Sequence, residues 1–175
     1  MNRWIKLWVV GLAAVSLAGT ASAQLLRFRS FGTGNFVAHL SGGQEVPAAE
    51  TRGTGQAVLS VNEDRSEVRY KVLVANVEKI TQSHIHCAGA GVNGPVVAFL
   101  FGFIPDGETL DGILAQGKIR QENIIARPDS AACPGGLSTL EDLLVKMEAG
   151  QAYVNVHTIQ YPGGEIRGQI RPPEM

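Results

Sequence analysis

Apolar and polar residues alternate along much of this chain, and this alternation limits the fold class. The segment 55–61 (GQAVLSV) places alanine, leucine and valine on one face, and 67–77 (EVRYKVLVANV) shows the same period of two. A period of two is typical of a half-buried β-strand. The polar residues 62–66 favour a turn, so the two segments are expected to form a hairpin.

Further segments show the same strand pattern, with Gly/Pro turns between them. We expect them at 35–40, 80–86, 96–101, 117–120, 152–158 and 165–171. Many short strands joined by turns predict an all-β Greek-key sandwich or barrel of about seven to nine strands.

One segment, 138–149, has helical spacing instead. Its leucines and methionine recur every three or four residues, which predicts a short surface helix. Ser138 and Glu141 are expected to form a capping box, and Gly150 to end the helix.

The N-terminus has the features of a secretory signal peptide. Arg3 and Lys6 precede the apolar run 7–18, and the small residues 21–23 (ASA) form a cleavage signal. We therefore expect a signal peptide at 1–23, a lead-in at 24–34 and one domain at 35–172. The mature chain would have no membrane span and would be exported, to the periplasm or outside the cell.

Export would change the net charge of the mature chain and the oxidation state of its cysteines. Loss of Arg3 and Lys6 changes the net charge from −1 to −3, and the other basic residues are dispersed, so nucleic acid is not an expected partner. Cys87 and Cys133 are the two cysteines. An oxidising compartment favours a disulfide between them.

Three histidines have the residue type and spacing of metal ligands. His84 and His86 are two residues apart on an expected strand, so they share a face, while Ile85 and Cys87 face the other way. His157 shares a face with Asn155 on another strand. Three neutral imidazoles suit Cu²⁺ or Zn²⁺, and the usual preference order favours copper. Histidines that only form hydrogen bonds can show the same pattern.

Two other polar residues have weaker signals. His39 has no partner near it in sequence, so we interpret it as structural. Glu45 lies in a loop bounded by glycine and proline, where carboxylates usually face water. We find no catalytic nucleophile–base arrangement and no phosphate-binding glycine loop.

Three long segments together resemble the chordin-type CHRD domain. They are LSGGQEVPAAETRGTGQA, SHIHCAGAGVNGPVVAFL and AGQAYVNVHTIQYPGGEIRGQI, within 36–170 and in the family's order. The resemblance implies an exported all-β module, found alone in bacteria and repeated in an animal extracellular antagonist of growth factors. It implies a binding role but names no reaction.

A more remote similarity connects 55–86 and the segment GGEIRGQI to copper–zinc superoxide dismutases. It implies copper ligation by His84, His86 and His157 and an anion-steering charge on Arg167. The chain departs from that pattern because the loop after His86 has no bridging histidine and no zinc-ligand cluster precedes Cys133. A zinc site is therefore not expected, and copper would have one imidazole fewer.

Two classes of function follow. The first is an exported binding module for an extracellular or cell-envelope ligand, with a histidine-lined copper site. The alternative is a copper protein, either a superoxide-dismutase-like redox enzyme or a copper-handling protein. The sequence does not decide whether the protein is an enzyme.

Overall fold

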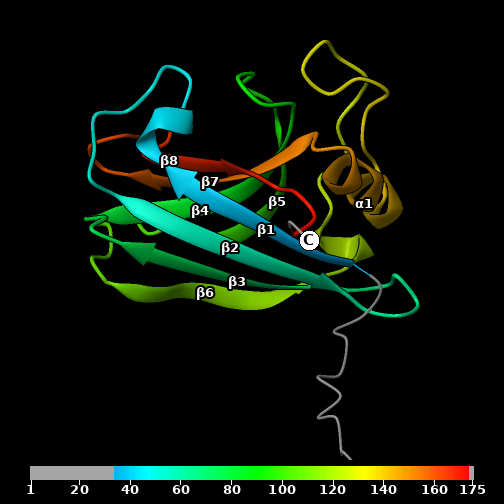
Figure 1. The fold of residues 1–175 in the computed structure, drawn as a ribbon, viewed down its shortest axis with the longest axis horizontal. Coiled ribbons are helices and arrows are strands. Elements are labelled where there is room, and N and C mark those ends of the chain that lie inside the picture. Colours follow the sequence, from blue (N-terminus) through cyan, green and yellow to red (C-terminus); the bar gives the residue numbers. More distant parts are fainter. Residues whose placement is uncertain (1–33, 174–175) are drawn as a thin grey trace, which may run out of the picture.

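The computed structural model describes residues 34–173, and in this range the chain is almost entirely β-structure (Figure 1). The strands are β1 (Gly34–Ser41), β2 (Thr54–Val61), β3 (Val68–Ala75), β4 (Ile80–Cys87), β5 (Val96–Gly102), β6 (Gly112–Ile119), β7 (Ala152–Thr158) and β8 (Ile166–Gln169). The helices are η1 (Gly42–Gln44), η2 (Gln121–Asn123) and α1 (Leu140–Glu148). The predicted signal peptide lies outside the described residues. None of the described helices has the length and apolar character needed to cross a membrane.

The eight described strands form one antiparallel sheet in the order β5-β4-β7-β8-β1-β2-β3-β6. Neighbours such as β3–β6, β4–β7 and β8–β1 are not consecutive in sequence, which gives Greek-key crossovers. Figure 1 shows β1, β2, β3 and β6 as one layer and β4, β5, β7 and β8 as the other. The two ends of the sheet approach each other, because the Tyr70 hydroxyl on β3 donates to the Leu100 carbonyl on β5 at 2.9 Å. The predicted all-β sandwich or barrel is confirmed.

The core lies between the two layers and uses the inward half of each alternating strand. Leu59 on β2, Val72 on β3 and Ile85 on β4 are fully buried. The prediction was least accurate for β6, which begins at Gly112 rather than at residue 117. A register shift at Val72/Leu73 in the β3–β6 pairing interrupts the period of two.

Helix α1 covers one end of the barrel and has a different cap from the predicted one. The Thr139 hydroxyl accepts from the Asp142 amide at 3.0 Å, and Asp142 accepts from the Thr139 amide at 2.8 Å. The predicted box of Ser138 and Glu141 is therefore wrong by one residue. Glu141 instead pairs with Arg65 at 2.9 Å. Gly150 follows the helix with a φ of 64°, as a residue ending a helix often does.

The predicted Cys87–Cys133 disulfide is present. It joins the end of β4 to the segment that precedes α1, with 5.3 Å between the Cα atoms. Both cysteines are fully buried in the core. Cys87 therefore points away from the face that carries His84 and His86.

Candidate metal centre

The pairing of β4 with β7 brings the three histidines together on the outer face of the sheet. In this register His84 is opposite Asn155, and His86 is opposite Tyr153. His157 is opposite Gln82, which makes it a diagonal neighbour of His84. One ligand nitrogen from each histidine lies within 4.8 Å of the others.

The closest approach is between His84 and His157. His84 Nδ1 is 3.2 Å from His157 Nε2, and the ring centroids are 4.9 Å apart. Two nitrogens bound to one ion at 2.0–2.1 Å in tetrahedral geometry lie about 3.3 Å apart. The observed separation therefore fits two ligands of one ion.

Two irregularities in the neighbouring pairing flank His84. The register between β4 and β5 shifts between Ser83 and His84 and again between Ile85 and His86. Shifts of this kind are β-bulges or related irregularities, which often occur beside functional sites because they change the direction of a side chain. Here they flank His84 and precede His86, the two histidines of β4.

The three imidazoles face outward, as predicted, but they are not exposed. Only 3%, 8% and 7% of His84, His86 and His157 is accessible to solvent. The expected surface site is therefore a covered one. Phe99 packs edge-on against His84 at 4.6 Å between ring centroids, and Tyr153 stacks on His86 at 4.7 Å with an angle of 9°.

Backbone carbonyls determine which nitrogens are available as ligands. His86 Nδ1 donates to the Gly94 carbonyl at 2.8 Å, and His157 Nδ1 donates to the Pro162 carbonyl at 3.0 Å. A neutral imidazole with a proton on Nδ1 has its lone pair on Nε2. Nε2 of His86 can therefore ligate, and so can Nε2 of His157 in this tautomer, although that atom also lies 3.1 Å from Oδ1 of Asn155. The carbonyls act as the outer partners that ligating histidines normally have.

Two buried nitrogens in this cluster have no hydrogen-bond partner. They are Nε2 of His84 and Nε2 of His86. Buried polar atoms are nearly always paired, because an unpaired one loses its hydration without compensation. The His86 atom therefore points to a ligand, whereas ligation by His84 through the Nδ1 that faces His157 would leave its Nε2 as an N–H without an acceptor.

Burial also keeps the imidazoles neutral. It lowers the pKa of His84 to about 3, and the nearby His157 and His86 lower this pKa further. It lowers the pKa of His86 to about 4, and it lowers the pKa of His157 as well. At neutral pH all three rings have lone pairs, as metal ligation requires.

Comparison with known proteins gives the family. The family model described as the CHRD domain matches residues 36–170, which include all three histidines. The chain belongs to the CHRD-domain family. No curated protein and no solved structure matches it, so these comparisons do not support the similarity to copper–zinc superoxide dismutases. Membership in the CHRD family suggests a binding module.

Arg167 of this CHRD domain, expected to steer anions, is only 1% exposed. Its guanidinium lies over the Tyr153 ring, 3.4 Å from the centroid. It donates to the carbonyls of Gly89 and Val92 and to the Asn93 side chain, at 2.9–3.3 Å. These contacts favour a role in anchoring the loop that supplies the Gly94 carbonyl to His86.

Glu45 differs from the expectation drawn from the sequence, whereas His39 lies apart from the histidine cluster. Glu45, predicted to face water, is 7% exposed, and its Oε1 has no hydrogen-bond partner. Burial raises its pKa to about 7, although the nearby Arg167 charge opposes the shift. His39 is exposed on β1 and is not part of the histidine cluster.

Sequence reasoning missed the residues that cover and orient the CHRD-domain histidines. Phe99 lies on β5, and the Gly94 and Pro162 carbonyls lie in loops. Backbone carbonyls have no sequence signal. The alternation in 152–158 did place Tyr153 and Asn155 on the face of His157, and this was the one available clue.

Proposed function

We propose that this protein is an exported CHRD-domain binding module that holds a copper ion on His84, His86 and His157. One observation carries the proposal: three buried imidazoles each offer one nitrogen within 4.8 Å of the others, and Nε2 of His86 has no hydrogen-bond partner. The Gly94 and Pro162 carbonyls support it, because an Nδ1–H donated to each of them leaves the lone pair of that ring on Nε2.

Copper is favoured by the donor set. Three neutral nitrogens form the cluster, and Cys87, the adjacent cysteine, is in a disulfide on the other face of β4. Among divalent first-row metals, copper binds most tightly to a given nitrogen site. Zinc also accepts three imidazoles, so the test must compare the two ions directly.

The residues of the site are better suited to binding copper than to catalysing a reaction on a substrate. They supply neutral donors, fix the rings through Gly94 and Pro162, and exclude water with Phe99 and Tyr153. Bound copper would supply a Cu²⁺/Cu⁺ couple. A cluster that is less than a tenth exposed limits access of a substrate to that couple.

Export to an oxidising compartment is supported by the disulfide and by the predicted signal peptide. The partner that the proposal implies is therefore an extracellular or cell-envelope molecule. Secretion is checked by N-terminal sequencing of the protein recovered outside the cytoplasm, with residue 24 as the expected first residue.

The metal is tested by copper and zinc titration of untagged protein, followed by elemental analysis. We expect one copper per chain, with copper displacing zinc. A His84→Ala/His86→Ala variant should lose this binding. His39→Ala is the matched control, because His39 is the fourth histidine and lies outside the cluster.

Equal copper binding by the double variant and the wild type would overturn the proposal. Electron paramagnetic resonance of the copper-loaded wild type gives an independent check that does not depend on folding of the variant, because three nitrogen ligands should give nitrogen hyperfine splitting. A superoxide-consumption assay on the loaded protein separates a copper carrier from the redox enzyme. We expect little or no turnover.

A further inference from the structure

A large groove lies on the outer face of the layer opposite the histidine cluster. It has a volume of about 1570 Å³ and is lined mainly by residues of β1, β2, β3 and β6 and by residues 171–173, together with Gln44 and Gln169. Pockets for drug-sized ligands usually occupy about 300–1,000 Å³. The groove is therefore large enough for an extended ligand.

The groove is positively charged although the chain as a whole is not. Four cationic side chains line it, and none of its described lining residues is a carboxylate. The cations are Arg69, Lys71, Lys118 and Arg171. The whole chain has a net charge of −1, so this surface concentrates charge of the opposite sign. Such a concentration favours an anionic partner.

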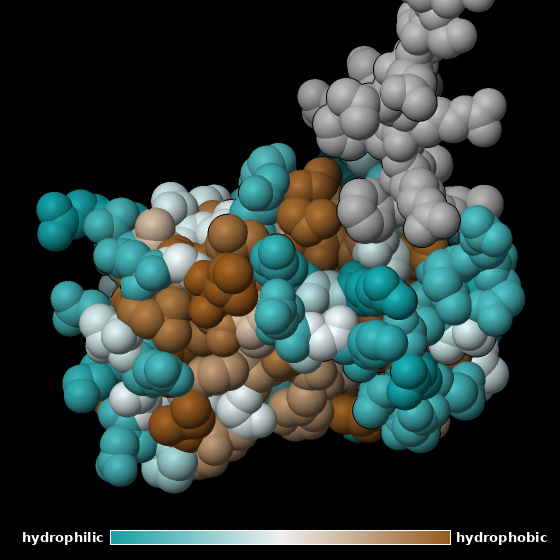
Figure 2. Space-filling view, turned by 90° about the horizontal axis from the view of Figure 1, so that it is seen from below, coloured by the Kyte–Doolittle hydropathy of each residue, from teal (hydrophilic) through white to brown (hydrophobic). Residues whose placement is uncertain are grey.

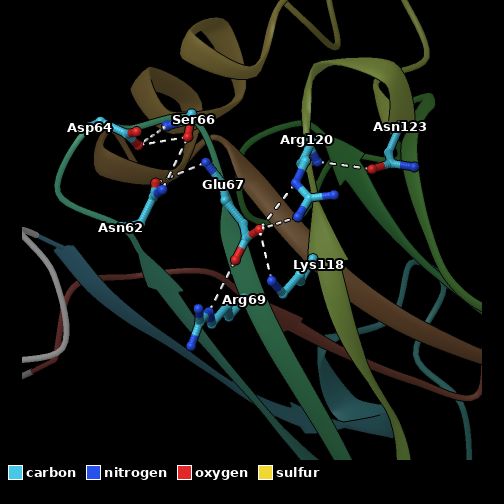
Figure 3. A network of polar contacts seen from close by, with 8 residues as sticks. All are labelled: Asn62, Asp64, Ser66, Glu67, Arg69, Lys118, Arg120 and Asn123. Carbon is cyan, nitrogen blue, oxygen red and sulfur yellow. Dashed lines mark hydrogen bonds and ion pairs between the residues drawn. The ribbon is translucent and has the colours of Figure 1, made fainter.

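At one end of the groove the buried carboxylate of Glu67 forms ion pairs with several of the cationic side chains, as Figure 3 shows. Glu67 accepts from Arg69, Lys118 and Arg120 at 2.7–3.1 Å. Burial of the carboxylate raises its pKa, but the three cations outweigh this effect and lower the pKa to about 2. One negative charge thus holds three positive charges, and a net positive charge remains at this end of the groove.

The rest of the lining consists of carboxamides and small apolar side chains. Asn35, Gln56 and Gln116 present amides, and Val58 is 43% exposed. The small apolar side chains of the lining are Val37, Val58, Pro172 and Pro173. Figure 2 views the molecule from the side where β3 and β6 lie in Figure 1 and shows apolar and hydrophilic side chains gathered in neighbouring areas. Amides bind hydroxyl groups, and an apolar floor suits the C–H faces of sugar rings.

Other polyanions fit this surface less well. Single-stranded nucleic acid needs exposed aromatic platforms, but Phe36 is 4% exposed and Tyr70 is half-buried with its hydroxyl bonded to Leu100. His39 is the one exposed ring in the described lining. An acidic peptide in β-conformation would need a free strand edge, and the backbone groups of β1, β2 and β3 are paired within the sheet.

We propose that this groove binds an extended anionic polysaccharide, with carboxylate or sulfate groups on Arg69, Lys71, Lys118 and Arg171 and sugar hydroxyls on the amides. The site is distinct from the histidine cluster and does not depend on copper. A uronic-acid chain is the simplest ligand of this chemistry.

The probe is an oligogalacturonate, titrated by calorimetry into the full exported chain in the presence of a chelator. We expect binding that weakens with salt and no binding of neutral dextran. Lys71→Gln/Arg171→Gln should weaken binding about tenfold. These two cations form no ion pair within the described residues, so the Glu67 network stays intact.

The matched control is Arg52→Gln/Lys79→Gln, which removes the same charge from exposed positions outside the groove. It should bind almost as wild type, as should His84→Ala/His86→Ala. Equal loss in the groove variant and the Arg52/Lys79 control would show a general charge effect and overturn the proposal. Absence of binding, or tighter binding of poly-glutamate than of oligogalacturonate, would also overturn it.

Discussion

His84 shows how single residues determine the properties of the candidate centre. One ring nitrogen faces His157 at 3.2 Å, the other is buried without a partner, and Phe99 covers the ring edge. Phe99 is itself 51% exposed. It therefore separates the imidazole from solvent without being part of the core.

Removal of this cover should open the copper site. In Phe99→Ala we expect a chelator to remove copper several-fold faster than from wild type, because His84 becomes accessible. The free energy of unfolding should change by about 1 kcal/mol or less, since the ring is half exposed. Stopped-flow transfer of copper to a coloured chelator measures the rate, and urea unfolding measures the stability.

Ile113→Ala is the control for this change, because Ile113 is 52% exposed and lies on β6. It should leave the rate of copper removal unchanged. An equal rate in Phe99→Ala and wild type would show that Phe99 does not control access.

The face of the strand on which His84 and His86 lie was predictable from the sequence, but their burial was not. A period of two places His84 and His86 opposite Ile85 whatever surrounds the strand. Burial depends on what packs over that face, and here the cover comes from Phe99 on β5 and from the Gly94 and Pro162 loops. These contacts follow from the Greek-key topology, which residue spacing does not specify.

At the scale of elements, the strands followed the alternation wherever pairing was regular. The prediction was poor at β6, where a register shift interrupts the period, and one residue off at the α1 cap. The cap was ambiguous in sequence because Ser138 and Thr139 are adjacent and acidic residues follow both. The Arg65–Glu141 pair, distant in sequence, removes Glu141 from the capping role.

This cap position can be tested by two single substitutions. Thr139→Ala should lower the free energy of unfolding by about 1 kcal/mol, because the Asp142 amide loses its acceptor. Ser138→Ala should cost less, since the Ser138 hydroxyl only donates to Asp142 at 3.2 Å. Urea unfolding of both variants measures which of the two residues stabilises the start of α1 more. A larger loss in Ser138→Ala would restore the capping box predicted from sequence.

The disulfide links two elements and should stabilise both. Cys87 and Cys133 are 46 residues apart, and closing a loop of this length stabilises by about 4 kcal/mol in the chain-entropy model. Cys87→Ala/Cys133→Ala should therefore lower the free energy of unfolding by about that amount. Urea unfolding with and without reductant measures it, and reductant should affect the wild type alone. A wild type that reductant does not destabilise would contradict this prediction.

At the scale of the whole molecule, buried titratable groups make stability depend on pH. Burial lowers the pKa values of His84, His86 and His157 below the ordinary value of 6.5, to about 3 for His84 and about 4 for His86. Below pH 6.5 the unfolded chain therefore binds more protons than the folded one. Each imidazole then costs up to about 1.4 kcal/mol per pH unit as the pH falls.

Glu45 has the opposite effect on the pH dependence of the stability. Burial raises its pKa from 4.5 to about 7, so between these values the folded chain binds the proton more tightly than the unfolded chain. Its contribution therefore favours folding as the pH falls from 7 to 4.5. Among the described residues, the one carboxyl of Glu45 offsets only part of the effect of the three imidazoles, because the unfolded imidazoles together bind more protons than Glu45 already near pH 7.

We therefore expect the metal-free protein to be most stable above pH 7 and to lose stability steadily as the pH falls toward 4. Urea unfolding of chelator-treated protein at a series of pH values measures this curve. In Glu45→Gln the free energy of unfolding should fall more steeply below pH 6.5, because the carboxyl group that opposes the effect of the imidazoles is removed. In His84→Ala/His86→Ala it should fall less steeply, because two of the three imidazoles are removed. The same acid dependence in this double variant and in the wild type would mean that these histidines do not control the pH response.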